Sequence, residues 1–381
     1  MGTSWGTLVV GGSVAAVTAA SELRRLGYDE RIVLISDESR PPYARPPMSK
    51  GVLAGGDSVE SVTLPPFGDD VEVRLAARAD SLDLTRRRVR LADGDELPFD
   101  SLLIATGARA RTLGLEEATG EHVLRTLDDC LDLRNRLVRA SSVVVVGGGL
   151  LGMEFASTCQ QLGVRVTLVD LGPPLVRQLG PFLAYVLVGA ALDAGVKIQD
   201  APGGVNLLGS EDRLGGVQLK DGSRFEADLV LTAIGCRPNS EWLASSGLNL
   251  SGGVVVDEFC RAAPGVMAAG DVAAWAHARG EPRRTPHYMH AVDQARAAAA
   301  TIALGSSAQP YRPSPYFWTE QFGLAVKVCG PLPLTGVPRL VEGSLRDQAA
   351  VLCWEDRGVP VAAATINHRM PLKRLRELAG S

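Results

Sequence analysis

Three glycines at a fixed spacing, Gly147, Gly149 and Gly152, form a complete Gly-x-Gly-x-x-Gly turn. In such a turn the first glycine permits a tight reversal, the second lets the backbone approach a pyrophosphate, and the third lets a helix pack closely on a strand. The N-terminus of that helix also offers free N–H groups to phosphate oxygens. An apolar run at 143–146 and a helix-like run at 153–162 flank the turn, as this chemistry requires. The sequence therefore predicts that a dinucleotide binds here.

A carboxylate lies where the ribose of such a dinucleotide would be recognised. Asp170 ends the next strand-like run, 165–170, at the distance along the chain that the motif requires. A carboxylate at this place can accept hydrogen bonds from both ribose hydroxyls, and it would repel a 2′-phosphate. We therefore expect NADH rather than NADPH at this turn, and we assign Leu151 and Gly235 to the same site.

A less regular turn of the same kind comes earlier in the chain. Gly11 holds the first glycine position, but Ser13 stands at the second and Ala16 at the third. Small residues still allow a close approach to a ligand, and Asp37, which we prefer to Glu38, follows the next strand-like run as a ribose-binding acid. The alternative is a helix that merely begins with small residues.

An internal repeat indicates how these turns are positioned. Residues 89–110 (VRLADGDELPFDSLLIATGARA) and 217–238 (VQLKDGSRFEADLVLTAIGCRP) align without a gap. Each copy holds an Asp-Gly pair, which favours a tight hairpin turn, and then a run that is almost entirely apolar, as in strands covered on both faces. Because each copy follows one of the two glycine-rich turns, the sequence predicts two related nucleotide-binding domains built from βαβ units.

The expected fold class is α/β, with two Rossmann-like nucleotide-binding domains and a small α+β C-terminal domain. We expect the domain of the first turn to comprise residues 1–112 and 240–309, and the domain of the second turn to comprise 113–239. The C-terminal domain would comprise 310–381, where the sequence becomes rich in proline and aromatic residues and then continues in short β-like runs.

The composition argues against a nucleic-acid or membrane partner. The formal net charge is −4 and the isoelectric point is near 5.8, which gives no general attraction to nucleic acid or to an anionic membrane. The apolar run 8–20 has no basic residue before it and is interrupted by glycines, so we interpret it as a strand and a helix start rather than a signal peptide. We therefore expect a cytoplasmic protein; the oligomeric state cannot be read.

The six cysteines show no pattern of redox or metal chemistry. They include no Cys-x-x-Cys pair, and none has metal-ligand spacing with a histidine. We therefore expect reduced thiols and no metal site. The first of them, Cys130, lies well beyond the helix that follows the first glycine-rich turn.

Five further motifs resemble one family. The run 41–50 (PPYARPPMSK) is similar to the PYxRPPLSK signature of FAD-dependent ferredoxin reductases of the glutathione-reductase-like fold, the class that serves oxygenases. The runs 105–109 (ATGAR), 124–129 (LRTLDD), 268–271 (AAGD) and 316–323 (YFWTEQFG) also look like that family's motifs, in its order. The resemblance covers essentially the whole chain, and it implies FAD at the first turn and NADH at the second.

The resemblance also implies roles for individual residues. It assigns the following to FAD: Gly11, Ser13, Ala15, Asp37, Arg45, Lys50, Ala79, Ala105, Thr106, Gly107, Arg125, Gly270, Asp271 and Trp318. Lys50 is expected beside the flavin atom that receives hydride, paired with Glu154 from the second glycine-rich helix, and these two are the expected catalytic residues. Each assignment has an alternative: Arg125 as a charge at a helix end, Trp318 as a core aromatic, and Asp271 as a helix cap.

The chain departs from the family in one segment. Where the family has Glu-x-Trp, this sequence reads Pro286-His287-Tyr288, which leaves the contacts at one end of the flavin open. His287 and His290 are interpreted as structural, because hydride transfer to a flavin needs no acid–base group. The C-terminal domain is also somewhat short for the family.

The function that the resemblance implies is an NADH-dependent ferredoxin reductase. Hydride would pass from NADH to FAD, and single electrons would then pass to a [2Fe–2S] ferredoxin that feeds a haem-thiolate monooxygenase or a Rieske dioxygenase. Disulfide and peroxide reductases of the same fold need cysteines on the first domain's helix, where this chain has none. Two alternatives stay open: an NADH oxidase or quinone reductase independent of ferredoxin, and an NADH-sensing flavoprotein that acts by binding a partner, like apoptosis-inducing factor.

Overall fold

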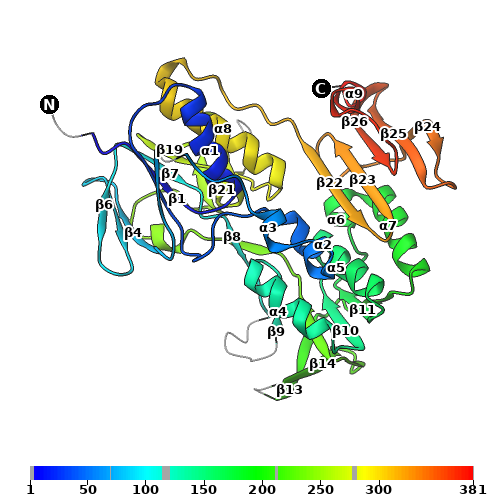
Figure 1. Ribbon diagram of the computed structural model, residues 1–381. Helices are drawn as coiled ribbons and strands as arrows, with labels where there is room; N and C mark the ends of the chain where they lie inside the picture. Colours follow the sequence, from blue (N-terminus) through cyan, green and yellow to red (C-terminus); the bar gives the residue numbers. More distant parts are fainter. Residues whose placement is uncertain (1–3, 69, 114–120, 211–212, 277–280, 381) are drawn as a thin grey trace. The chain divides into compact units, whose positions relative to one another are not determined.

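The computed structural model describes residues 4–68, 70–113, 121–210, 213–276 and 281–380 (Figure 1). The chain divides into two compact units, each built from three separate stretches. Unit 1 comprises Met1–Ala44, Val62–Arg109 and Arg237–Pro313. Unit 2 comprises Arg45–Ser61, Ala110–Cys236 and Ser314–Ser381.

Unit 1 is built around a largely parallel sheet in the order β19–β20–β7–β1–β2–β3, in which only β19 runs antiparallel to its neighbour. Its strands are β1 (Thr7–Val10), β2 (Ile32–Ile35), β3 (Val71–Arg74), β7 (Ser101–Ile104), β19 (Arg261–Ala263) and β20 (Val266–Ala268). Helices α1 (Val14–Arg25) and α8 (Tyr288–Leu304) lie side by side on one face and pack through small alanine side chains (Figure 1). The predicted strand and helix within the apolar run 8–20 are confirmed as β1 and the start of α1.

The other face of this sheet is covered by β structure, so the central strands are apolar on both sides. The covering elements are β4 (Ala79–Asp83), β5 (Arg88–Leu91), β6 (Glu96–Pro98), β18 (Val254–Val256) and β21 (Ala273–Trp275). Unit 1 also contains the short helices η2 (Glu241–Leu243), η3 (Gly270–Val272) and η4 (Gly305–Ser307). A separate two-stranded pairing joins β8 (Ala108–Ala110) and β17 (Cys236–Pro238).

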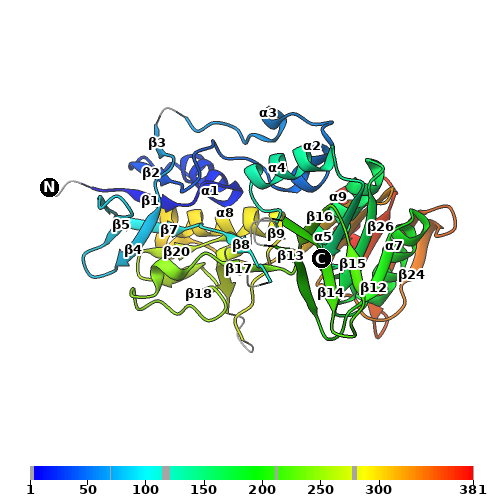
Figure 2. The ribbon, with the colours of Figure 1, turned by 90° about the horizontal axis from the view of Figure 1, so that it is seen from below.

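Unit 2 contains a parallel sheet in the order β12–β11–β10–β16–β9. Its strands are β9 (Glu121–His122), β10 (Ser142–Val146), β11 (Arg165–Asp170), β12 (Lys197–Asp200) and β16 (Leu229–Thr232). A small antiparallel sheet packs against its apolar core and can be followed in Figure 2: β13 (Val205–Ser210), β14 (Arg213–Leu219) and β15 (Arg224–Glu226). The helices of this part are α4 (Leu127–Leu137), α5 (Leu150–Gln161), α6 (Val176–Leu179) and α7 (Pro181–Asp193).

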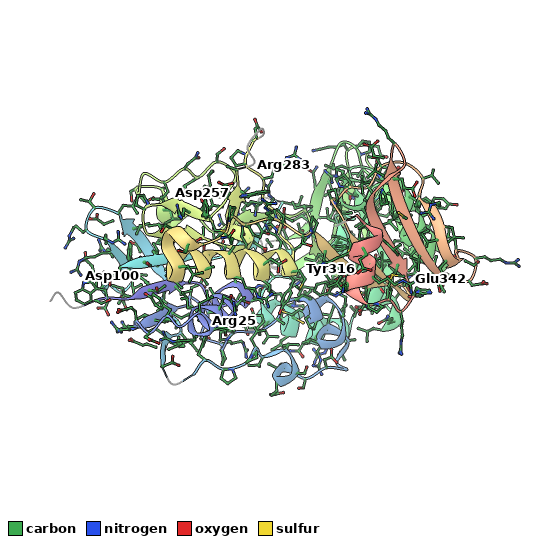
Figure 3. All side chains as sticks on the ribbon, turned by 90° about the horizontal axis from the view of Figure 1, so that it is seen from above. Arg25, Asp100, Asp257, Arg283, Tyr316 and Glu342 are labelled. Atoms are coloured by element: carbon green, nitrogen blue, oxygen red, sulfur yellow. The ribbon has the colours of Figure 1, made fainter. Side chains whose placement is uncertain are left out.

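The rest of unit 2 comes from both sides of these elements in the sequence. An antiparallel sheet in the order β22–β23–β26–β25–β24 is formed by β22 (Tyr316–Gln321), β23 (Leu324–Cys329), β24 (Arg339–Ser344), β25 (Ala349–Asp356) and β26 (Val359–Ile366). Helix α9 (Leu372–Leu378) packs on it beside Tyr316, which Figure 3 labels. The early segment adds η1 (Pro46–Ser49), α2 (Gly51–Ala54) and most of α3 (Val59–Val62).

The internal repeat is confirmed as a structural repeat. The order β3–β2–β1–β7 in unit 1 corresponds to β12–β11–β10–β16 in unit 2. Both predicted hairpin turns are present: the Asp93 carboxylate accepts from the backbone N–H two residues on (3.0 Å), and that of Asp221 does the same (2.9 Å). The repeated sequence therefore encodes the same local hydrogen bonds and the same strand order twice.

The repeat also fixes where each apolar strand begins. Asp100 (labelled in Figure 3) accepts hydrogen bonds from the backbone N–H groups of Trp5 (2.6 Å) and Gly6 (2.8 Å), just before β1. Asp228, at the matching position, accepts from the N–H groups of Ser141 (2.9 Å) and Ser142 (3.1 Å) at the start of β10. Burial raises the pKa of both carboxyls, but hydrogen bonds to their charged forms outweigh it, so both pKa values are lowered.

Among the described residues, no helix has both the length and the apolarity needed to cross a membrane.

Candidate nucleotide sites and a buried ion pair

The three glycines of the second turn are required for different reasons. Gly147 has φ +107°, and a Cβ there would lie 2.5 Å from the carbonyl oxygen of Ala233. A Cβ on Gly152 would lie 1.9 Å from the carbonyl oxygen of Gly147, so only glycine lets α5 pack this closely. A Cβ on Gly149 would meet only the flexible amide of Gln178, at 3.3 Å. The second glycine therefore leaves an accessible backbone at the start of α5, as the predicted dinucleotide site requires.

Asp170 lies at this turn, as the sequence predicted. It is the last residue of β11, and one carboxylate oxygen accepts from the backbone N–H of Gly148 (2.8 Å) while the other accepts from that of Leu171 (2.7 Å). The guanidinium of Arg177 approaches to 3.7 Å, but its side chain is 71% exposed and the pair is weak. The carboxylate therefore has a fixed position at the carboxyl end of the sheet.

The two remaining residues assigned to this turn are also near it in the fold. Leu151 is in the first turn of α5 and is 36% exposed. Gly235 follows β16, the neighbour of β10, and has φ +97° with no atom within 4 Å of a Cβ built on it. Both therefore lie at the carboxyl edge of the sheet of unit 2.

The irregular first turn has the same backbone form as the second. Gly11 has φ +133°, and a Cβ there would lie 2.1 Å from the carbonyl oxygen of Ala105. Ser13 is the extended N-cap residue of α1 (φ −130°, ψ −168°), as Gly149 is of α5 (φ −76°, ψ −177°). Ala16 is fully buried. The small substitutes for glycine therefore preserve the turn and the helix N-terminus that a phosphate group needs.

The acidic residues after β2 differ in their surroundings. Asp37 is exposed, whereas Glu38 accepts a hydrogen bond from the hydroxyl of Tyr43 (2.5 Å). A Cβ on Gly12 would lie 2.4 Å from the Ser36 hydroxyl oxygen, so the turn and the end of β2 are in contact. Asp37 stays the predicted ribose-binding acid. Ala79, assigned to the adenine, is the half-buried first residue of β4.

A buried amide donor without a partner lies next to the predicted Gly-Asp motif. The backbone N–H of Gly270 donates to the side-chain oxygen of Gln294 (2.9 Å), and a Cβ on Gly270 would lie 3.3 Å from that of Ala15 in α1. The Nε2 group of Gln294 is fully buried and has no hydrogen-bond partner among the described residues. Asp271 follows directly in η3. Sequence reasoning missed Gln294; its free donor suits a polar cofactor, since buried donors are normally satisfied.

Thr106 and Gly107 are held by a residue that sequence reasoning also missed. The Thr106 hydroxyl donates to the carbonyl oxygen of Asn239 (2.7 Å), and the Asn239 amide donates back to the Thr106 carbonyl oxygen (2.9 Å). The backbone N–H of Asn239 donates to the carbonyl oxygen of Gly107 (3.0 Å). Because its only proton is engaged, the Thr106 hydroxyl can serve a cofactor only as an acceptor.

Unit 2 contains the ion pair that the resemblance implied. The Lys50 ammonium lies 2.6 Å from Oε2 of Glu154, whose residue is 8% exposed, and it also donates to the carbonyl oxygen of Pro46 (3.2 Å). Two hydroxyls complete the surroundings of the carboxylate: Ser49 donates to Oε2 and Thr319 donates to Oε1, both at 2.6 Å. Sequence reasoning missed these two residues, although they adjoin Lys50 and Trp318 in the motifs already singled out.

The other unit 2 residues assigned to FAD have the following positions. Arg45 is half-buried and precedes η1. Arg125 precedes α4, and its backbone N–H donates to the carboxylate of Asp129 (2.9 Å). The Trp318 ring stacks on that of Tyr316, with centroids 6.0 Å apart and planes 21° apart. The alternatives for Arg125 and Trp318 stay open.

Comparison with known proteins identifies the class to which this architecture belongs. The family described as pyridine nucleotide-disulphide oxidoreductase matches residues 6–298. The chain belongs to this family.

Similar proteins extend over nearly the whole chain. The ferredoxin reductase component of chlorobenzene dioxygenase from Cupriavidus sp. (strain PS12) is 36% identical over 90% of this chain and 85% of that protein. The biphenyl dioxygenase system ferredoxin–NAD(+) reductase component of Paraburkholderia xenovorans (strain LB400) is 36% identical over 98% and 92%. The ferredoxin reductase for the CYP199A2 system of Rhodopseudomonas palustris superposes with a TM-score of 0.88, at 32% identity over 95% and 91%.

This oxidoreductase has no disulfide to match its family name. All six cysteines are free in the structure. Burial raises the pKa of Cys130 to about 11 and that of Cys159 to about 12, so neither is a reactive thiolate near neutral pH. In the described part of the chain, no cluster of three or more histidine, cysteine, aspartate or glutamate side chains could hold a metal ion.

The two histidines at the start of α8 have lowered pKa values, because burial disfavours their charged forms. Burial lowers the pKa of His290 to about 4, with a smaller contribution from His287, and Asp271 opposes the shift. Burial also lowers the pKa of His287. The Nδ1 atom of His290 lies 3.1 Å from the hydroxyl of Tyr311. This arrangement agrees with the interpretation of both histidines as structural.

Acidification from pH 7 to pH 5 is expected to lower the free energy of unfolding by about 2 kcal/mol through His290 alone. Below the ordinary histidine pKa, the unfolded chain binds a proton at His290. The folded protein binds that proton only when the pH approaches the lowered pKa, so the free energy of unfolding decreases as the pH falls. Urea unfolding at both pH values should show that His290→Gln loses about 2 kcal/mol less than the wild type. Equal losses in the two proteins would contradict this assignment.

Proposed function

We propose that this oxidoreductase is an NADH-dependent reductase that delivers electrons through FAD to a [2Fe–2S] ferredoxin serving an oxygenase. FAD, when bound, accepts hydride from NADH and releases electrons singly, which amino-acid side chains cannot do. The observation that carries the proposal is the ion pair between Lys50 and Glu154, in which Glu154 is on the helix that begins at the proposed NADH turn, in a chain whose cysteines are all free.

The proposed domains follow from the two turns. Residues 1–112 and 240–309 form the FAD-binding domain, 113–239 the NADH-binding domain, and 310–381 the C-terminal domain. In unit 1 the proposed FAD ligands are Gly11, Ser13, Ala15, Asp37, Ala79, Ala105, Thr106, Gly107, Gly270 and Asp271. The helix N-terminus of α1 and the free amide donor of Gln294 support this assignment.

The second glycine-rich turn and further motifs of the sequence supply the other proposed ligands. Those of NADH are Gly147, Gly149, Leu151, Gly152, Asp170 and Gly235, and those of FAD are Arg45, Lys50, Arg125 and Trp318. The open backbone at Gly149 binds the pyrophosphate, and the Asp170 carboxylate binds the ribose and disfavours a 2′-phosphate. Glu154 holds the Lys50 ammonium, which would stabilise negative charge on a flavin bound beside it.

The choice of acceptor is supported by the similar proteins. Two of the similar proteins named above are reductase components of dioxygenase systems. Another similar structure is that of a covalent complex of putidaredoxin reductase with putidaredoxin, at 28% identity and a TM-score of 0.87. The rubredoxin–NAD(+) reductase of Pseudomonas putida is 34% identical over 85% of this chain. An iron–sulphur electron carrier is the partner common to these names, and [2Fe–2S] ferredoxin is the type that we propose. The reaction is placed in the cytoplasm, where NADH is regenerated.

Reduction of cytochrome c by NADH should be stimulated about tenfold or more when a [2Fe–2S] ferredoxin from the same organism is added, because docking of the carrier supplies the one-electron acceptor. The same assay with NADPH should run at least about tenfold more slowly in kcat/KM, because of the Asp170 carboxylate.

Parallel assays with rubredoxin, a quinone and oxygen separate the remaining possibilities. Stimulation by rubredoxin alone would correct the type of carrier. Turnover with quinone or oxygen and none with any carrier would establish the ferredoxin-independent oxidase or quinone reductase instead. Slow turnover with every acceptor would favour an NADH-sensing protein that acts by binding a partner.

A further inference from the structure

The Glu154 carboxylate is held on both of its oxygens by separate parts of the chain. Oε2 accepts from the Ser49 hydroxyl and the Lys50 ammonium, and Oε1 accepts from the Thr319 hydroxyl, all at 2.6 Å. Ser49 ends η1, Glu154 is in α5 and Thr319 is in β22, and all three belong to unit 2. With donors on both oxygens, the carboxylate cannot rotate about its last bond without losing a charge-assisted hydrogen bond.

The two residues that carry these hydroxyls each make a further hydrogen bond. Thr319 is fully buried, and its oxygen accepts a hydrogen bond from the Nε2 group of Gln321 (3.0 Å). A hydroxyl has only one proton. Because the Thr319 oxygen accepts from the Gln321 amide, that proton is available for the hydrogen bond to Glu154. Ser49 is 3% exposed, and its carbonyl oxygen accepts from the hydroxyl of Thr158 in α5 (2.7 Å). Its hydroxyl also lies 3.4 Å from the carbonyl oxygen of Pro46, a longer contact than the 2.6 Å bond to Glu154. Each donor to Glu154 is thus anchored by a second hydrogen bond.

The side-chain oxygen of Gln321 indicates that this arrangement has a cost in stability. Its Oε1 atom is buried and has no hydrogen-bond partner among the described residues. An unsatisfied buried acceptor destabilises the fold. Thr319 and Gln321 lie on one face of β22, and Trp318 lies on the opposite face, since side chains alternate along a strand. Strand β22 therefore carries Trp318 on one face and, on the other face, the Thr319 hydroxyl that orients Glu154.

We propose that Ser49 and Thr319 are positioning residues that fix Glu154 and, through it, the Lys50 ammonium. The proposal rests on the proposed function, because the fixed ammonium matters for hydride transfer. Neither hydroxyl is required to touch a cofactor or to exchange a proton in the reaction. Among the described residues, Oε1 has no donor without the Thr319 hydroxyl, and Lys50 is the only donor to Oε2 without the Ser49 hydroxyl. In either case the carboxylate is held less firmly, and the Lys50 side chain, which is 20% exposed, then leaves its position for solvent.

The test compares Thr319→Val, which removes only the hydroxyl, with Thr319→Ser, which keeps it, and adds Ser49→Ala as a second, independent variant. One measurement is the acetylation of Lys50 by limiting acetic anhydride, quantified by mass spectrometry against the exposed Lys197 as an internal reference. The other is the limiting rate of flavin reduction by NADH, with the dissociation constant of NADH, in anaerobic stopped-flow experiments on the FAD-loaded protein. Thr301→Val, which removes a buried and hydrogen-bonded hydroxyl from α8 in unit 1, is the matched control.

We expect Thr319→Val and Ser49→Ala to raise the labelling of Lys50 several-fold and to lower the limiting rate about tenfold, with little change in NADH affinity. Thr319→Ser and Thr301→Val should resemble the wild type in both measurements. Unchanged labelling in both hydroxyl-deleted variants would overturn the proposal, and so would increased labelling with an unchanged rate. If NADH does not reduce the wild-type flavin at all, the proposed function fails, and the labelling still decides whether the hydroxyls hold the pair.

Discussion

Replacing Lys50 by methionine together with Glu154 by glutamine is expected to slow the reduction of bound FAD by NADH about 100-fold, with a much smaller change in NADH affinity. The double variant removes both charges of the buried pair and keeps the shapes of the side chains. The single Lys50→Met variant would leave the Glu154 carboxylate, 8% exposed, without its counter-charge and would destabilise the fold. A loss seen in the double variant is therefore a loss of catalysis.

Stopped-flow measurements of flavin absorbance give the rate and the affinity separately. Lys220→Met, which removes an exposed ammonium from unit 2, is the control and should reduce at the wild-type rate. A double variant that retains FAD and reduces within twofold of the wild type would remove Lys50 and Glu154 from the list of catalytic residues.

Gly152→Ala is expected to lower the free energy of unfolding by about 3 kcal/mol and to weaken NADH binding more than tenfold. The added Cβ would lie 1.9 Å from the carbonyl oxygen of Gly147 and 3.3 Å from a methyl carbon of Val145, so α5 must move away from β10. That movement opens the turn whose backbone N–H groups face the pyrophosphate. Urea unfolding and NADH titration measure the two effects.

Two other glycines provide matched comparisons for this substitution. Gly189 lies inside α7 with no atom within 4 Å of a Cβ built on it, so Gly189→Ala should stabilise the protein by about 0.5–1 kcal/mol. Gly149→Ala, which meets only the end of Gln178, should keep the stability and weaken NADH binding. If Gly152→Ala were as stable as Gly189→Ala, the third glycine would have no packing role.

Much of the fold follows from rules that act over a few residues. The Asp-Gly turns, the apolar strands and the glycine turn at 147–152 can be read from the sequence because each depends on neighbouring residues and on the local backbone angle. The repeat then doubles each signal, so the strand order of unit 1 predicts that of unit 2. Asp170 was found in the same way, since one strand and one turn fix its position.

The pairing of Lys50 with Glu154 was expected from the family resemblance and not from the local pattern, because the two residues are 104 positions apart in the chain. The hydroxyl donors to Glu154 were not expected at all. Ser49 is 105 positions from Glu154 and Thr319 is 165 positions from it, and no periodicity relates residues at such distances. Asn239, 133 positions from Thr106, was missed for the same reason.

By itself, then, the sequence determined the second glycine-rich turn, the acid that accompanies it, and the absence of a cysteine pair. Local backbone geometry and residue chemistry suffice for each of these. Only the tertiary structure decided that the first turn keeps its form despite Ser13 and Ala16, and which groups complete the surroundings of Glu154. The physical reason is that a buried charge must be satisfied by whatever donors packing brings within about 3 Å, and packing joins segments that are far apart in the chain.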